Sequence, residues 1–459
     1  MYQKISQKLV KTYHNYKHLL LAILIGLSIV LVNTHPIQSK TSSDIIRERE
    51  KIVNIAELEH FSEMIDTLEN KWKNDYEGYF NRNFSSSSRS AKQISEHLAE
   101  ITQQAGIKPA VIWAVPTDSF LELMLITPGE QFVVKKVWGG NRQRLNLRIK
   151  ELEEGIADPR SLKYYPPARI IYQWLFKPLE PYLEAEGIDT LLLCTGPNLR
   201  SLPFAALHDG EKFVMEKYNL ARIPAFSLTD TSYKARSDRQ VLAMGTSEFE
   251  DLPSLPGVTI ELNTIVPKIW SGSKIIDQDF TVENLAKAHQ KGSFDIIHLA
   301  THSWFYPGSP ENSFIQFSDR KLNLKQLADL ELEIPKVDLL VLSACQTALG
   351  NKDAEFGFAG LAMQAGVKSA LASLWSVDDA GTVVLMSEFY EQLKSTTIKS
   401  QALRQAQMNM LHKKVSLEGT EVKGLEVAVN LPADIMSEEV PDFTHPFYWA
   451  GFTVIGNPW

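Results

Sequence analysis

The chain has 459 residues, 44% of them hydrophobic and 22% charged, and its formal net charge is -8. This composition is typical of globular proteins that bury a substantial core, and the length suggests about two to four domains. The basic residues form no dense tract, so no nucleic-acid partner is expected, and two cysteines are too few for a disulfide framework or a four-cysteine zinc site.

The first 40 residues have the pattern of an export segment. Four lysines within the first 17 residues precede LLLAILIGLSIVLV, residues 19–32, which carries no charge. A run of this length suits the apolar core of a signal peptide and is short for a membrane-spanning helix. We expect residues 1–40 to act as a cleaved signal peptide or as an uncleaved signal-anchor, which would make the membrane a partner through residues 19–32. In both cases the bulk of the chain would lie outside the cytoplasm, on the periplasmic side.

Residues 41–89 are predicted to form a helical segment followed by a serine-rich linker. An apolar stripe recurs there at spacings of three and four residues, at Leu58, Phe61, Ile65, Leu68 and Trp72. Such a stripe either packs on the globular body or serves as a partner-binding stalk. The run of serines from Ser85 to Ser88 predicts the linker.

Residues 90–236 mix predicted helices and strands in an α+β pattern. A short helix ends at Gly106, and a β-meander follows, with strands at 110–115, 120–127 and 132–137. Two helical stretches, at 145–152 and 168–184, lead to a continuous apolar run at 188–194. Such a run is typical of a strand buried in a parallel sheet. We interpret residues 90–236 as an ancillary part of the fold.

Residues 237–459 alternate between strands and helices. Each of four apolar strands is followed by a helical stretch; the strands are predicted at 241–245, 294–300, 337–343 and 369–374. Repeated alternation implies right-handed βαβ units and a three-layer α/β/α sandwich with a mainly parallel sheet. A loop-rich insertion at 413–442 precedes a last strand at 448–455.

Two reactive side chains come directly after two of these strands. FDIIHLATHSW places His302 past one strand, and DLLVLSACQT places Cys345 past the next. Sites in open α/β sheets form outside the carboxyl ends of the strands, so if these two strands are neighbours, the imidazole and the sulfur lie across one crevice. A thiolate is a nucleophile, and a nearby imidazole lowers the pKa of the thiol or takes its proton.

Other histidine and cysteine positions favour structural roles. His298 lies four residues before His302, but Leu299 follows it instead of glutamate, so the H-E-x-x-H zinc motif is absent. Cys194 ends another apolar strand, and no histidine precedes it at a comparable spacing. A cysteine at a strand end is ordinarily an inert core residue, which is also the alternative for Cys345.

Several segments of the second half resemble the CHAT family of caspase-like proteins, a branch of the caspase, separase and gingipain superfamily. The matching segments are LRSLPFAALHDGEKFVMEKYNL (199–220), IHLATH (297–302), LSACQTALG (342–350), GFAGLAMQAGVKSALASLWSVDDAGT (357–382) and HPFYWAGFTVIGNPW (445–459). The resemblance covers residues 165 to 459, and more weakly begins at 90. The chain is similar to CHAT sequences of the cyanobacterial type.

The resemblance implies a caspase-like cysteine endopeptidase with a His302–Cys345 dyad acting on a protein or peptide substrate. The backbone N–H groups of Cys345 and Ser303 would form the oxyanion hole, where each donor is worth about 2.7–4 kcal/mol. Position 303 is usually glycine in this family, and serine disfavours positive φ, so a misaligned hole is an open alternative. Residues 90–236 would then shape the substrate groove.

A substrate pocket is expected by analogy from Asp353 and Glu355 and from the segment between Trp375 and Asp379. An acidic floor, with Asp378 contributing, would select a basic P1 side chain, so we expect cleavage after Arg or Lys. Alternatively, Asp378 and Asp379 cap the helix predicted near Thr382.

The sequence lacks the phosphate-binding, dinucleotide-binding and serine-hydrolase motifs, so no cofactor and no metal are expected. Two other functions stay open besides the peptidase. One is a catalytically weak or inactive CHAT module that acts in signalling or interaction, and Ser303 is its best sequence support. The other is an acyl-transferase or amidase that uses the same dyad on non-protein substrates.

Overall fold

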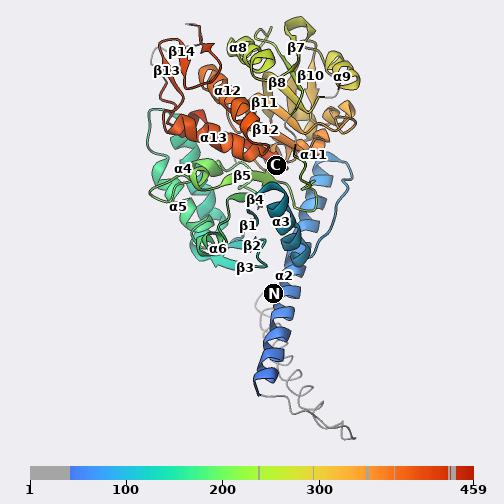
Figure 1. Cartoon of the computed structure of the whole chain (residues 1–459), viewed down its shortest axis with the longest axis vertical. Helices are drawn as coiled ribbons and strands as arrows, with labels where there is room; N and C mark the ends of the chain where they lie inside the picture. Colours follow the sequence, from blue (N-terminus) through green and yellow to red (C-terminus); the bar gives the residue numbers. More distant parts are fainter. Residues whose placement is uncertain are drawn as a thin grey trace. The chain divides into compact units, whose positions relative to one another are not determined.

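The computed structural model describes residues 42–235, 238–292, 294–347, 351–376, 378–432, 435 and 441–459, with side chains from Leu58 onward. The chain divides into two compact units, Met1–Glu57 and Leu58–Trp459, and the fold below is that of the second unit (Figure 1). The predicted export segment at 1–40 lies outside the described residues.

The expectation of a transmembrane helix needs a correction. In the described part of the chain, no helix is both long enough and apolar enough to cross a membrane. The segment on which that expectation was based, residues 19–32, lies outside the described residues.

The helices of the described chain are α2 (Ser42–Phe80), α3 (Ala91–Ala105), α4 (Arg142–Ala157), α5 (Tyr165–Leu175), α6 (Glu180–Glu186), α7 (Val214–Lys217), α8 (Gly257–Asn263), α9 (Val282–Lys291), α10 (Lys352–Ala359), α11 (Leu361–Ala365), α12 (Asp379–Ser395) and α13 (Lys399–Leu411). Their ends follow local chemistry. Ser90 and Gln93 form a capping box at the start of α3, and Gly106 ends that helix at φ 70°.

The strands are β1 (Pro109–Pro116), β2 (Leu121–Ile126), β3 (Phe132–Val137), β4 (Thr190–Thr195), β5 (Asn219–Ile223), β6 (Val241–Gly245), β7 (Gly272–Ile276), β8 (Ile296–Phe305), β9 (Phe314–Gln316), β10 (Lys321–Asn323), β11 (Leu339–Thr347), β12 (Ser369–Ser373), β13 (Ser416–Glu418), β14 (Glu421–Lys423), β15 (Val429–Asn430) and β16 (Phe452–Gly456). Strands β13, β14 and β15 form a small separate sheet within the predicted insertion at 413–442.

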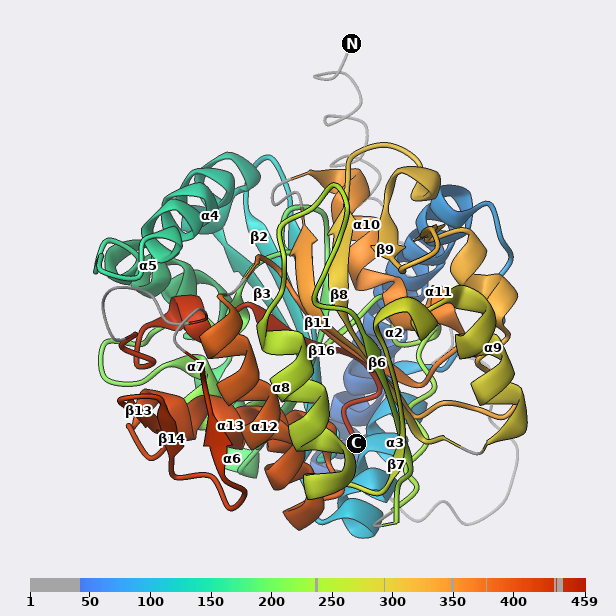
Figure 2. The ribbon, with the colours of Figure 1, turned by 90° about the horizontal axis from the view of Figure 1, so that it is seen from above.

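One mixed, mostly parallel sheet organises the body. Its order is β10-β9-β8-β11-β12-β16-β5-β4-β1-β2-β3, and β6 and β7 extend it from β8. Helices cover both faces: seen from above, α8, α12 and α13 lie on one side of the sheet, and α9, α10 and α11 lie on the other (Figure 2). The predicted three-layer α/β/α class is confirmed.

The predicted ancillary and catalytic parts share this sheet. β5 of the first part pairs in parallel with β16 of the second, with Val454 opposite Ala221. Leu58–Trp459 is also one compact unit. A division near residue 236 therefore remains a prediction about function and does not correspond to a break in the sheet.

Helix α2 packs its apolar stripe on this body. Phe61, Ile65 and Trp72 are buried in a cluster with strand residues such as Trp113. The Glu69 carboxylate lies within the same contact and accepts hydrogen bonds from Trp113 Nε1 at 2.7 Å and from Ser227 N at 2.8 Å. From Leu58 onward the stripe is thus a packing surface, the first of the two interpretations of the pattern.

The sheet forks along one edge of β8. β6 pairs with the first half of β8, with Val241 opposite Ile296 and Gly245 opposite Ala300. β9 pairs with the second half of the same edge, at Ser303 and Trp304. β6 and the β9–β10 hairpin therefore leave β8 as two separate branches.

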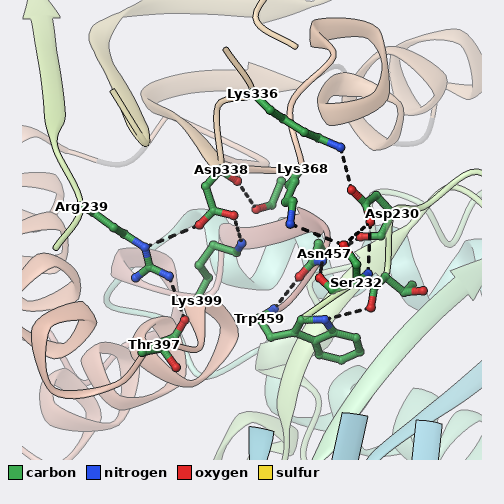
Figure 3. A network of polar contacts seen from close by, with 12 residues as sticks. Asp230, Ser232, Arg239, Lys336, Asp338, Lys368, Thr397, Lys399, Asn457 and Trp459 are labelled. Carbon is green, nitrogen blue, oxygen red and sulfur yellow. Dashed lines mark hydrogen bonds and ion pairs between the residues drawn. The ribbon is translucent and has the colours of Figure 1, made fainter. Parts of the chain in front are cut away.

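A network of buried charges fixes the amino ends of the central strands (Figure 3). Asp338, just before β11, lies 3.1 Å from Lys399 Nζ and 3.5 Å from Arg239 Nε, and both cations are 1% exposed. Arg239 Nη2 also donates to the carbonyl oxygen of Thr397 at 3.0 Å. Burial lowers the pKa of Lys399 to about 8. The network ties the start of β11 to the start of α13.

Candidate active site

The two strands that carry the predicted dyad are parallel neighbours. Along β8 and β11, Leu342 is opposite Leu299, Ala344 is opposite His302, and Cys345 is opposite Ser303. The register shifts between Leu342 and Ala344, where β8 contains one extra residue. His302 and Cys345 thus stand one register step apart at the carboxyl ends of adjacent strands.

Both strands run further than the sequence pattern predicts. β8 continues to Phe305 and β11 continues to Thr347, so His302 and Cys345 lie within strands and not in loops after them. The polar residues at these ends do not stop the strands because each pairs with its neighbour across the sheet. Successive side chains along a strand point to opposite faces, so the face of each residue matters here.

The Cys345 thiol is sealed inside the protein. The residue is 1% exposed and belongs to an apolar cluster that also contains Phe305 and Phe356. Its sulfur lies 3.1 Å from Ser303 Oγ, and it donates to the carbonyl oxygen of Leu342 at 3.4 Å. Burial raises the pKa of the thiol to about 12, and the hydrogen bond from Ser303 offsets only part of this rise. The sulfur is therefore protonated at neutral pH.

The His302 imidazole is held by different neighbours. Its Nε2 lies 2.9 Å from the carbonyl oxygen of Pro253, in the loop after β6. The ring stacks on Trp304 with centroids 5.0 Å apart and is tilted against Phe249 at 4.8 Å. A carbonyl oxygen only accepts, so Nε2 carries the proton in this contact and Nδ1 is left as the basic nitrogen.

The structure brings the two strand ends together but not the two reacting groups. Side chains at adjacent positions alternate, so His302 and Ser303 point to opposite faces of the sheet. The Cys345 sulfur contacts Ser303, which puts the thiol on the face away from the imidazole. Among the described residues, no hydrogen bond joins His302 to Cys345. The resting geometry is not an assembled dyad.

Ser303 fits its position without strain. It is 1% exposed, is paired on both sides in the sheet, and is not one of the residues with positive φ. The concern that serine would be forced into a left-handed conformation therefore does not apply here. Its side chain has a different effect, because the hydroxyl occupies the space next to the sulfur.

The four predicted pocket residues each contact a neighbouring group in the described chain. Asp353 accepts from Gly308 N at 3.1 Å, and Asp378 caps α12 by accepting from Gly381 N at 2.6 Å. Trp375 Nε1 donates to the carbonyl oxygen of Phe447 at 2.9 Å. The cap was the alternative function of Asp378, and the structure shows that contact. Each of these side chains already has a structural partner.

Glu355 is buried completely and joins the two parts of the chain. Its carboxylate accepts from Asn198 N and from Ser201 Oγ, both at 2.8 Å, and burial raises its pKa. The guanidinium of Arg200 lies beside it, 4.1 Å from the centre of the Phe356 ring. The sequence pattern did not identify this cluster, although the LRSLPF segment carries its basic and hydroxyl members.

An open groove lies in the fork of the sheet. It has a volume of about 800 Å³, and its walls are residues 246–252, 277–278 and 316–321. Five carboxylates line it against two cations; the carboxylates are Glu248, Glu250, Asp251, Asp277 and Asp319. The wall formed by residues 246–252 leads directly to Pro253, which holds His302. Sequence analysis missed this groove because the fork is a property of strand pairing.

Comparison with known proteins places the fold among known families. A family model described as the CHAT domain matches residues 165–457. A search of curated proteins returns no match. Cyanobacterial relatedness stays a prediction.

Two solved structures illustrate the structural likeness. Separase in the Saccharomyces cerevisiae separase–securin complex is 9% identical with a TM-score of 0.44, over 81% of this chain and 32% of the separase chain. The structure of the Arg-specific cysteine proteinase gingipain R (RgpB) is 15% identical with a TM-score of 0.39, over 66% of this chain and 69% of that chain. The complex of the pro- and mature domains of Porphyromonas gingivalis RgpB is similar as well. This chain thus spans about a third of the separase chain. These likenesses do not extend to an activity.

Proposed function

The chain belongs to the CHAT domain family, and from this premise we propose that it is a caspase-like cysteine endopeptidase with Cys345 as nucleophile and His302 as base. One observation carries the proposal: the two residues occupy the carboxyl ends of adjacent parallel strands, one register step apart. That edge is where α/β sheets place their sites.

The proposed reaction uses a thiol, an imidazole and water. His302 takes the proton of Cys345, and the sulfur attacks the carbonyl carbon of the scissile peptide. The C–N bond breaks as His302 gives the proton to the leaving amine, and water then hydrolyses the thioester to a carboxylate. The N–H groups of Ser303 and Cys345 would stabilise the oxyanion.

This chemistry requires a rearrangement of the resting site. Because the two side chains lie on opposite faces of the sheet, the paired ends of β8 and β11 have to separate before the two groups meet. The sulfur also has to leave Ser303 Oγ, and the His302 ring has to leave the Pro253 carbonyl. The raised pKa of the buried thiol also indicates that a rearrangement is needed, because the thiolate forms only once solvent or the imidazole reaches the sulfur. The described conformation is in our proposal a latent state of the enzyme.

The proposed substrate is a protein segment that passes through the groove in the fork of the sheet. The excess of carboxylates on its walls favours a segment rich in lysine or arginine. Cleavage after Arg or Lys remains part of the proposal, with Asp353 and Asp378 as the carboxylates concerned. A peptide library that shows preference for Asp or Met at P1 would reject it. Export of the chain by a signal peptide within residues 1–40 likewise remains a proposal.

A second function has a specific observation in its favour. The thiol and the imidazole lie on opposite faces of the sheet, and an inactive CHAT module acting in signalling or interaction would keep such an arrangement permanently. Turnover of protein substrates distinguishes this module from a latent peptidase.

The test is peptidase activity of the full chain on a panel of fluorogenic peptides with basic and acidic P1 residues. We expect Cys345→Ala to lose turnover by about 1,000-fold or more, because removal of a catalytic nucleophile costs on that order. Cys194→Ala is the matched control: this second cysteine is equally buried but lies at another strand end, and the variant should keep its turnover. Equal turnover by wild type and Cys345→Ala, or none by either under any activating condition, favours the inactive module.

A further inference from the structure

The segment 246–257, which comprises the loop after β6 and Gly257, the first residue of α8, contacts three parts of the candidate site. Residues 246–252 line the groove, and Pro253 accepts the hydrogen bond from His302. At its far end, Gly257 N donates to Oδ2 of Asp379 at 3.0 Å. Asp379 is the first residue of α12. The proposed peptidase function uses residues 246–252 as a wall of the substrate groove, but it assigns no role to the contact between Gly257 and Asp379.

A backbone hydrogen bond closes the loop on itself. Leu255 N donates to the carbonyl oxygen of Ser247 at 2.8 Å, which closes the segment on itself. Phe249, inside the closed segment, lies against the His302 ring at 4.8 Å. The Pro253 carbonyl and the Phe249 ring, both in this loop, therefore contact the His302 imidazole.

The Asp379 contact fixes where this closed loop sits. Gly257 is buried, and a Cβ added to it would lie 3.2 Å from the Asp379 Cβ and 3.1 Å from Val383 Cγ2. A larger residue at position 257 would be tight against these two side chains, so glycine lets the loop lie close to α12. Asp378, the preceding residue, contacts Gly381 N instead, so the two aspartates have separate tasks.

We propose that loop 246–257 is a latch that holds the His302 imidazole in its resting position, and that Asp379 is the positioning residue that holds the latch closed. The inference rests on the proposed function, because it concerns the control of the same histidine. When the contact between Gly257 and Asp379 opens, the loop moves with Pro253 and Phe249, and the imidazole becomes free to turn.

The variants Asp379→Ala and Asp379→Asn test the latch. Alanine removes the acceptor for Gly257 N, whereas the side-chain oxygen of asparagine replaces it. The readout is the exchange rate with solvent of the His302 Nε2 proton, followed by NMR on the full chain with isotope-labelled histidine. We expect exchange to accelerate about tenfold or more in Asp379→Ala, the effect of losing a hydrogen bond to a charged acceptor, and to stay within about threefold of wild type in Asp379→Asn.

The experiment separates this inference from the peptidase proposal. Unchanged exchange in Asp379→Ala overturns the latch, whether or not peptides are cleaved. Accelerated exchange supports it even if wild type and variants show no turnover, in which case the peptidase proposal alone fails. If Asp379→Ala does not fold, as judged by circular dichroism, Phe249→Ala gives the same readout. Exchange should again accelerate, and a wild-type rate there overturns the latch.

Discussion

The two ends of β11 are built in opposite ways. At the amino end, Asp338 lies between the buried cations Lys399 and Arg239. At the carboxyl end, the contacts of Cys345 and of its neighbour His302 are hydrogen bonds and ring contacts, with no ion pair among the described residues. Charge-assisted contacts in a buried site are much costlier to break than neutral ones. One strand therefore has a fixed start and an end whose side chains can change partners.

The largest effect is expected at the fixed end. Asp338→Ala leaves the buried Lys399 without its carboxylate partner, so the free energy of unfolding should fall by about 3–5 kcal/mol. Urea denaturation followed by circular dichroism measures this loss. The matched control is Lys336→Ala, which breaks the 2.6 Å ion pair with Asp230 at a lysine that is 41% exposed. Its cost should be about 0–1 kcal/mol. Equal losses in the two variants would contradict the contrast between the ends.

The next effect concerns the pH dependence of Cys345 alkylation. Burial raises the pKa of this thiol to about 12, so in the native protein the thiolate fraction keeps rising through pH 8–10. In urea the thiol has its ordinary pKa of about 8.5, and its reaction rate should level off above that pH. At pH 8.5 native Cys345 should react with iodoacetamide more than about a hundredfold more slowly than the unfolded chain. Peptide mapping by mass spectrometry separates Cys345 from Cys194, and a plateau near pH 8.5 in the native protein would show that the site is open.

The smallest effect is expected for Ser303→Ala. This variant loses one hydrogen bond to the sulfur, so the free energy of unfolding should fall by only about 0.5–1.5 kcal/mol. The Ser303 hydrogen bond lowers the pKa of Cys345, so the pKa should rise in the variant and alkylation should slow further. Faster alkylation would mean instead that the hydroxyl mainly blocks access to the sulfur. Urea denaturation and the alkylation rate are measured on the same samples.

The fold was predictable because its signals are local. Continuous apolar runs predicted β4, β6, β8 and β11, and the alternation with helices predicted the parallel sheet. The elements that the sequence did not predict, such as β5, β9 and β10, are short and lie in segments without a clear period of two. The predicted helix at 168–184 is in fact α5 and α6, and Pro181 lies in the first turn of α6.

The candidate site was predictable only in part. That His302 and Cys345 lie at adjacent strand ends followed from the βαβ pattern, and the register confirms the adjacency. The face that each side chain occupies depends on the extra residue in β8 and on how far both strands continue. Hydrophobic periodicity predicts neither of these features. Glu355 shows the same limit, because its partners Asn198 and Ser201 come from a segment more than 150 residues away.

The fork in the sheet has a further consequence for what the groove can admit. β6 and β9 each pair with β8 but not with each other in the described chain. No ladder between β6 and β9 fixes the distance between the two branches; the β9–β10 hairpin is held by its pairing with β8 and by Ser318, which donates to the carbonyl oxygens of Phe280 and Asp277. The width of the groove is thus set by side chains and loops, which deform more cheaply than a backbone ladder. A mouth of this kind can accommodate polypeptide segments of different bulk while the strands beneath it stay in register.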